Sequence, residues 1–120
     1  MKPEIDATSF GSITIDGETY DHDVIIRLNG EVKKRKKKLS KSVFGTSHKI
    51  SLDEAEHIYE KGAEGVIIGA GQYGIVKLSK DAKIFFEKMK CEIDLQPTSK
   101  AMKHWNKAEK KVIGLFHITC

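Results

Sequence analysis

The sequence predicts a single α/β domain over residues 1–120, with a largely parallel sheet covered on both faces. Two apolar runs, residues 66–68 and 112–118, are typical of strands that are buried on both faces. Amphipathic helix patterns alternate with strands in the second half, which favours parallel strands joined by helical crossovers. Short β-branched segments with tight-turn dipeptides fill the first half and predict antiparallel strands at one edge.

The first 38 residues predict an antiparallel meander. Residues 13–15 alternate apolar and polar side chains, and Asp16-Gly17 supplies a two-residue hairpin turn. Residues 23–28 form a β-branched strand, and Asn29-Gly30 is a second favoured turn at its end. The strand after this turn enters a basic run.

Positive charge is concentrated in that run. Between residues 33 and 41 there are seven basic side chains and no acid, so 14 of the 21 basic residues remain against 17 acidic ones elsewhere. Alternate lysines on a strand face both sides, which favours a solvated edge that resists aggregation. Nucleic-acid binding through Lys33–Lys38 is a weaker alternative, because no aromatic residue or known nucleic-acid motif accompanies the run. We therefore expect no nucleic-acid partner.

Three helices are expected after the meander. Residues 39–50 predict an irregular polar loop, after which Ser51 and Glu54 match a capping box at a helix start. Ser79 is expected to cap a second helix whose apolar stripe packs on the sheet. Residues 92–95 predict a short strand, and Thr98 is expected to cap the third helix.

The strand at residues 66–68 runs into Gly69-Ala70-Gly71-Gln72-Tyr73-Gly74, which matches the dinucleotide-binding fingerprint. Dinucleotide binding requires a helix to begin directly after the glycines, but an extended segment comes before Ser79. Only 46 residues follow Gly74, too few for the rest of a dinucleotide fold. We expect no cofactor here. The pattern predicts a turn that needs positive φ, with exposed amides from Gly69 to Gly74 that could form an anion nest.

Other polar residues suggest further sites. Asp21 and Asp23 share one face of a strand while His22 points away, so no metal site is expected. Cys120 and His48 could form a nucleophile–base pair, and the alternative for Cys120 is a small apolar residue at the end of a buried strand. His48 lies in a polar loop, where function often resides, although a structural role in the turn is also open.

Several segments together resemble the adipogenesis-associated domain family, small α/β proteins whose molecular function is not established. Its superfamily includes a mitochondrial complex I assembly factor. The matching residues are Ile15-Asp16-Gly17, Tyr20, Asp23-Val24, Gly45-Thr46, His48, Glu60-Lys61-Gly62, Val66–Gly69, Gly71, Thr98, Ala101, Asn106 and Phe116–Cys120. The resemblance implies three layers: a mixed central sheet, flanking helices and an additional antiparallel β layer. It implies no catalytic residues, and the lysine run departs from the family pattern.

The function expected from the sequence is that of a non-enzymatic binding or assembly module in the cytosol. The N-terminus has no signal-peptide pattern, no apolar run is long enough to span a membrane, and the two cysteines are expected to be reduced. A small anion or a segment of a protein partner would bind at Gly69, Gly71 and Gly74, with Tyr73, His48 and Asn106 nearby. A small enzyme that uses Cys120 and His48 is the alternative.

Overall fold

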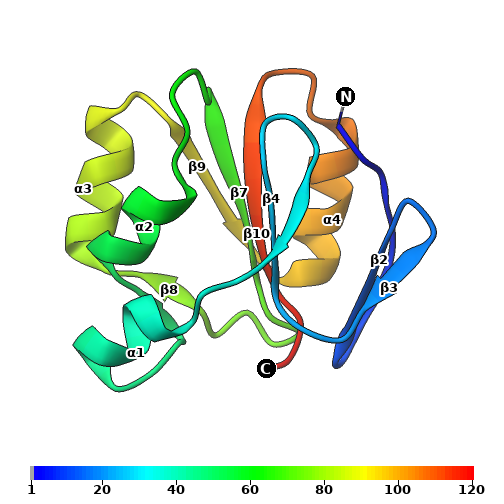
Figure 1. The fold of residues 1–120 in the computed structure, drawn as a ribbon, viewed down its shortest axis with the longest axis horizontal. Helices are drawn as coiled ribbons and strands as arrows, with labels where there is room; N and C mark the ends of the chain where they lie inside the picture. Colours follow the sequence, from blue (N-terminus) through cyan, green and yellow to red (C-terminus); the bar gives the residue numbers. More distant parts are fainter. Residues whose placement is uncertain (1) are drawn as a thin grey trace.

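The computed structural model describes residues 2–120, in which helices lie against a central β-sheet (Figure 1). Its central sheet has five strands in the order β5-β4-β10-β7-β9, and a separate antiparallel sheet has the order β1-β2-β3. The strands are β1 (Ile5–Ser9), β2 (Ser12–Ile15), β3 (Glu18–Tyr20), β4 (Val24–Ile26), β5 (Val32–Lys34), β6 (Lys49–Ile50), β7 (Gly65–Ala70), β8 (Lys77–Leu78), β9 (Glu92–Gln96) and β10 (Val112–His117). The helices are α1 (Lys38–Phe44), α2 (Leu52–Ile58), α3 (Lys80–Lys88) and α4 (Thr98–Lys107).

The two apolar runs form the middle of the sheet, as predicted. β10 lies parallel to β7 in a register from Val112 beside Gly65 to His117 beside Ala70. Every residue of both strands is buried. β9 is parallel to the other side of β7, whereas β4 and β5 form an antiparallel hairpin at the opposite edge. The prediction of a mixed sheet with antiparallel strands at one edge is therefore confirmed.

Each face of the sheet has its own hydrophobic core. Figure 1 shows α2 and α3 on one side of the sheet, and α4 with the three-stranded sheet on the other. Val66 and Ile68 belong to the core under α2 and α3, because alternate side chains of a strand point to opposite faces. Ile67 belongs to the core on the other face, with Trp105 of α4 and the three-stranded sheet. These are the three layers that the family resemblance implied.

The N-terminal strands divide differently from the predicted meander. β1 to β3 form their own sheet, while β4 and β5 pair into the central sheet. All three residues of β4 are buried, so this strand suits a position with cover on both faces. β1 was not recognised in the sequence, because only one of its five residues, Ile5, is buried.

The segment expected as an irregular loop contains the short helix α1. No side chain caps its N-terminus, so the usual start signal is missing. It ends at Gly45, which adopts a left-handed conformation with φ of 73°. Beyond it, β6 and β8 pair in parallel as a small two-stranded sheet.

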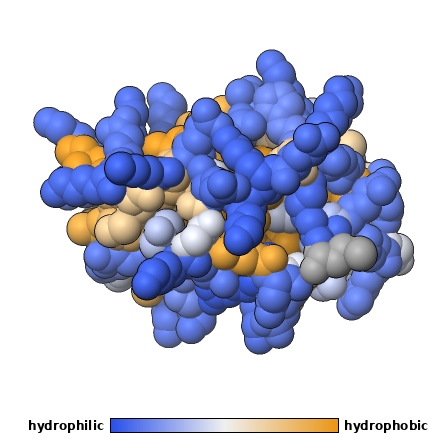
Figure 2. All heavy atoms as spheres, turned by 90° about the horizontal axis from the view of Figure 1, so that it is seen from above, coloured by the Kyte–Doolittle hydropathy of each residue, from blue (hydrophilic) through white to orange (hydrophobic). Residues whose placement is uncertain are grey.

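The surface is mostly polar. Figure 2 shows one face on which hydrophilic side chains cover most of the area, with smaller hydrophobic areas between them. Among the helices described over residues 2–120, none has the length and apolar character needed to cross a bilayer.

Candidate functional site

A group of charged and polar side chains is buried where β4, β10, α1 and α2 meet. We call it the Arg35 cluster: it consists of Asp23, Arg35, Ser40, Glu54 and His117, all at most 4% exposed. These residues come from five separate segments of the chain, so the tertiary fold assembles them. Buried ionic groups are stable only when they are paired and hydrogen-bonded, and here each one is.

Arg35 is the centre of the cluster. Its Nε and Nη2 donate to the two carboxylate oxygens of Glu54 at 2.6 and 3.0 Å. Its Nη1 donates to Asp23 Oδ2 at 2.9 Å, and Nη2 also donates to the Ser47 carbonyl at 2.7 Å. Burial lowers the pKa of Arg35, but the hydrogen bond and charge of Glu54, followed by those of Asp23, raise it above the ordinary value. This residue therefore departs from the solvated strand edge expected for the basic run.

Asp23 links Arg35 to the end of β10. Its Oδ2 accepts from His117 Nδ1 at 2.7 Å, and its Oδ1 accepts from the Ile118 amide at 3.0 Å. Burial alone would raise the pKa of Asp23. The hydrogen bonds and charges of His117, the Ile118 amide and Arg35 outweigh burial and lower that pKa to about 2. Asp23 is thus an ionised carboxylate in the interior.

Glu54 departs from the predicted capping box. Ser51 caps α2 as expected, since its Oγ accepts from the Glu54 amide at 3.1 Å. The Glu54 carboxylate, however, does not reach back to the start of its own helix. It accepts from Arg35 and from Ser40 Oγ, the latter at 2.5 Å, because charge-assisted bonds to a buried guanidinium are stronger than a bond to a neutral amide.

His48 packs edge-on against His117, with 5.4 Å between the ring centroids. Partial burial lowers the pKa of His48, and the nearby charges of His117, Arg35 and Lys37 lower it further. Within residues 2–120, no hydrogen bond joins His48 to Cys120; the carbonyl of Cys120 instead lies against Gly71. His48 therefore belongs beside the Arg35 cluster.

The lysine run covers the cluster and forms a pocket of about 600 Å³ in front of Asp23. We call it the basic pocket. Lys37 Nζ lies 3.7 Å from Asp23 Oδ2, so one lysine of the run contacts the cluster directly. Lys33 is not part of the lining; it pairs with Glu31 at 3.3 Å on the exposed edge. The lining residues are Asp21, His22, Asp23, Lys34, Arg35, Lys36, Lys37, Lys38, Ile118 and Thr119.

The glycine turn has the positive φ values that the sequence predicts, at Gly71 (96°) and Gly74 (67°). Three of its amides already have acceptors within the chain. The Gly71 amide donates to Thr98 Oγ1 at 2.9 Å, that of Gln72 to the Thr119 carbonyl at 2.7 Å, and that of Gly74 to the Gly71 carbonyl at 3.2 Å. A bound anion would need other donors. Gln72 Nε2 is one, since it is buried and has no hydrogen-bond partner in the described part of the chain.

The other predicted site residues lie in different surroundings. Tyr73 belongs to the turn and is 75% exposed, whereas Gly69 is buried inside β7. Asn106 lies about 12 Å along α4 from the turn, by helical rise. Its side chain holds β1 through bonds of 2.9 and 2.8 Å to the Ile5 backbone.

Thr98 was expected to cap α4 but is instead its first residue, after Pro97. Its hydroxyl accepts from the Gly71 amide and donates to the His117 carbonyl at 2.6 Å. The side chain therefore ties the glycine turn to the end of β10. Because Thr98 is the first residue of α4 and its side chain points to these two partners, no side chain caps the start of this helix.

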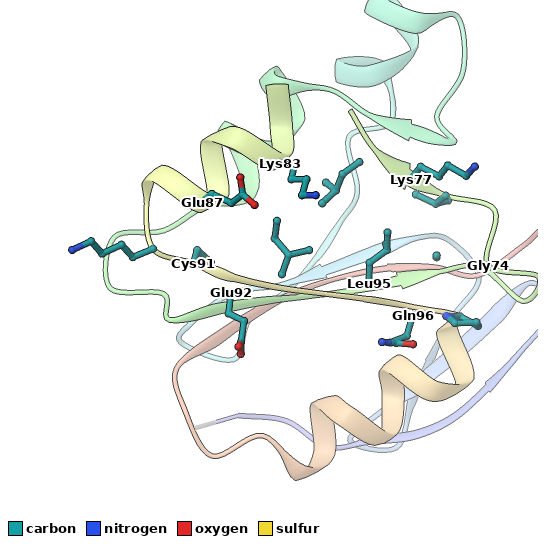
Figure 3. A pocket seen from close by; sticks show the side chains of 14 residues that line it. Gly74, Lys77, Lys83, Glu87, Cys91, Glu92, Leu95 and Gln96 are labelled. Carbon is teal, nitrogen blue, oxygen red and sulfur yellow. The ribbon is translucent and has the colours of Figure 1, made fainter. Parts of the chain in front are cut away.

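A larger groove of about 900 Å³ lies between α3, β9 and the glycine turn (Figure 3). Leu95 and Cys91 line it from β9 and the segment before β9, Lys83 and Glu87 from α3, and Gly74 lies at one end (Figure 3). Burial raises the pKa of the Cys91 thiol to about 11, so this thiol is neutral at physiological pH. Sequence patterns did not indicate this groove, because its walls come from separate elements.

The groove runs beside a free sheet edge. Across residues 2–120, β7 is the only strand that pairs with β9. The Glu92 amide donates to the Glu64 carbonyl, so the alternation along the strand directs the polar backbone groups of Ile93 and Leu95 away from β7. Their side chains contact the core under α3. β9 thus offers free backbone groups beside an apolar groove.

Comparisons with known proteins agree with this architecture. A family model described as "Protein of unknown function (DUF498/DUF598)" matches residues 5–117. The chain belongs to this family. A conserved hypothetical protein from Pyrococcus horikoshii is 31% identical over 98% of this chain and 99% of its own, with a TM-score of 0.88. No curated protein sequence matches significantly.

Two further structures extend the family comparison. A protein named MT938 is 29% identical over 99% of this chain and all of its own, with a TM-score of 0.82. An Mth938-like domain from Bordetella pertussis is 13% identical over 97% of this chain and 85% of its own, with a TM-score of 0.64. At that identity the last match shows the fold alone.

The segments that carried the family resemblance meet in space. Asp23 bonds His117, His48 packs on the same histidine, and Gly71 lies against Cys120. The Arg35 cluster and the glycine turn are therefore two sides of one region at the end of β10.

Proposed function

We propose that this protein is a binding or assembly module that holds an extended segment of a partner protein along β9. The observation that carries the proposal is the free edge of β9 beside the 900 Å³ groove. An incoming strand would bond to the backbone of Ile93 and Leu95 and place alternate side chains in the groove, a common mode of peptide recognition. Gly74 and Pro97 would lie at the end of the bound segment.

The charges around the groove favour an acidic segment. Lys77, Lys83 and Lys90 line it, against the acids Glu87 and Glu92. Glu92 is already neutralised by an ion pair with Lys110. The expected partner sequence therefore alternates apolar residues, for the groove, with aspartate or glutamate.

A second copy of this chain is a poorer occupant. Antiparallel pairing of two β9 strands through Ile93 and Leu95 places Asp94 directly opposite Asp94 of the other copy. Like charges that face each other across strands are destabilising. We therefore assign the groove to a different chain.

The wider proposal places the protein in the cytosol and in the adipogenesis-associated domain family. Both cysteines are free thiols, which suits a reducing compartment. The predicted ligand role of Gly69, Gly71, Gly74, Tyr73, His48 and Asn106 remains part of the proposal. Gln72 Nε2 adds an unused donor at the turn, where the amides of Gly71, Gln72 and Gly74 already bond within the chain.

The test uses an eight-residue peptide in which valine alternates with aspartate or glutamate, and a matched peptide with lysine at the acidic positions. Millimolar acidic peptide should shift the Ile93 and Leu95 amide signals and slow their hydrogen exchange. The Asp94 amide should change less, because it already points to β7. Unchanged Ile93 and Leu95 amides at saturating peptide would contradict strand addition.

Charge-reversal variants test the partner chemistry. Lys83→Glu should weaken binding of the acidic peptide, whereas Lys80→Glu, on the same helix but outside the groove, should not. Equal binding of the acidic and lysine peptides would refute the preference for acids. A sedimentation experiment that shows a dimer with β9 protected would assign the groove to a second copy instead.

A further inference from the structure

A continuous chain of hydrogen bonds leads from the Arg35 cluster to the basic pocket. Thr119 Oγ1 lies 3.1 Å from His117 Nε2, and His117 Nδ1 lies 2.7 Å from Asp23 Oδ2. The order is hydroxyl, imidazole, carboxylate. This is the arrangement of a nucleophile, a general base and the group that orients the base. It is separate from the groove at β9.

The hydrogen-bond partners of His117 indicate which of its ring nitrogens carries the proton. Asp23 is ionised and only accepts hydrogen bonds, so the tautomer of His117 that fits this contact carries its proton on Nδ1. His117 Nε2 is then the acceptor, and the Thr119 hydroxyl is the donor.

The three hydrogen-bonded residues differ in exposure as a catalytic site requires: the base is buried, and the nucleophile lies at the pocket. His117 and Asp23 are 1% and 2% exposed, so water does not compete for their hydrogen bond. Thr119 is half-buried and lines the basic pocket. Asp23 also lines the pocket, whereas His117 does not, so a molecule in the pocket lies beside Thr119 while the imidazole behind it stays covered.

The pocket wall indicates the class of substrate. Four lysines of the run, at positions 34, 36, 37 and 38, line it. These cations favour a ligand with a negatively charged group and would stabilise negative charge that develops on an oxygen. Of the four, Lys37 is the one in contact with Asp23, which places its ammonium beside the chain of hydrogen bonds.

We propose that Thr119 is a nucleophile, with His117 as its base and Asp23 as a positioning residue, in a site that hydrolyses anionic acyl esters. Thr119 Oγ1 bonds to the acyl carbon as its proton moves to His117 Nε2. The bond from the acyl carbon to the leaving oxygen then breaks, and that oxygen takes the proton from His117. Water hydrolyses the acyl-threonine by the same proton transfers, which restores Thr119 and releases the acid.

The experiment compares 4-acetoxy-3-nitrobenzoate, which is anionic, with neutral 4-nitrophenyl acetate, both of which release a coloured phenolate. The intact chain should hydrolyse the anionic ester roughly tenfold or more faster than Thr119→Val, a modest part of the usual contribution of a general base. Thr119→Ser should remain active. Thr119→Val should fold normally because the side chains are nearly isosteric.

Locating the acetyl group on the protein shows whether Thr119 or a neighbouring residue is the nucleophile. Trypsin cleavage after Lys111 leaves residues 112–120 as one peptide, in which an acetyl group on Thr119 is distinguished from one on Cys120 by fragmentation. Acetyl-Thr119 supports the proposal. Acetyl on Cys120, an unlabelled peptide, or the same rate in Thr119→Val would overturn it.

A second pair of variants tests the role of the pocket. Lys36→Ala/Lys38→Ala should reduce the preference for the anionic over the neutral ester, because both side chains line the pocket. Lys33→Ala removes the same charge from the same segment but outside the pocket, and should leave the preference unchanged. A preference equally affected by both changes would refute recognition in this pocket.

Discussion

Replacing Arg35 with methionine should destabilise the protein by about 3–5 kcal/mol, the usual cost of removing one partner from a buried ionic group. The side chain makes two bonds to Glu54, one to Asp23 and one to the Ser47 carbonyl. Its loss leaves two buried carboxylates without their main cation. Since small domains are stable by about 5–15 kcal/mol, this single change removes a large share of the total.

The measurement is urea unfolding at pH 7, followed by circular dichroism. Lys36→Met is the matched control, because it removes a neighbouring but exposed charge and should change the unfolding free energy by about 0.5 kcal/mol or less. Adding Glu54→Leu to Arg35→Met should recover part of the loss, since the two residues are directly coupled.

A loss below about 1 kcal/mol in Arg35→Met would refute this reasoning, because uncompensated buried carboxylates are far more costly than that. Strict additivity of the two substitutions would equally contradict direct coupling. The first outcome would mean that water enters the cluster and replaces Arg35. The second would mean that Arg35 and Glu54 do not stabilise the fold as a pair.

Two other predictions concern the same region. The pKa of Asp23 is lowered from 3.8 to about 2, so Asp23 contributes about 2 to 3 kcal/mol of stability above pH 4. This contribution is lost as the pH falls through 2; acid unfolding should show the loss, and Asp23→Asn should remove it. Gly71→Ala places a Cβ against the Cys120 carbonyl oxygen, well inside van der Waals contact, at a φ of 96°, and should cost about 3 kcal/mol in thermal unfolding. Gly62→Ala, with φ of 97° and nothing within 4 Å, should cost about 1 kcal/mol; equal losses in the two variants would mean that the Cys120 contact carries no energy.

Much of the scaffold was predictable because it depends on local patterns. The buried runs of β7 and β10, the hairpin turn at Asp16-Gly17 and the serine caps of α2 and α3 are all present. Elements with weak signals were missed, such as α1, which lacks a side-chain cap. The assignment of β4 and β5 to the central sheet depends on long-range pairing and was not visible in the meander pattern.

The candidate site was predictable only in fragments. The sequence identified Asp23, His48 and the end of β10 as candidate positions. It did not distinguish Arg35, at the centre of the cluster, from the lysines around it. Its difference lies in chemistry: a guanidinium fork binds carboxylates bidentately, whereas lysine does not. An arginine within a lysine run was the one available signal.

The sequence by itself determined the fold class, the two central strands and the positive φ at the glycine turn, because these depend on side-chain periodicity and on the backbone freedom of glycine. The tertiary structure decided everything that depends on side chains from distant segments. Residues 23, 35, 54 and 117 form one ionic cluster only after folding. The groove along β9 and the basic pocket arise in the same way, since their walls belong to separate elements.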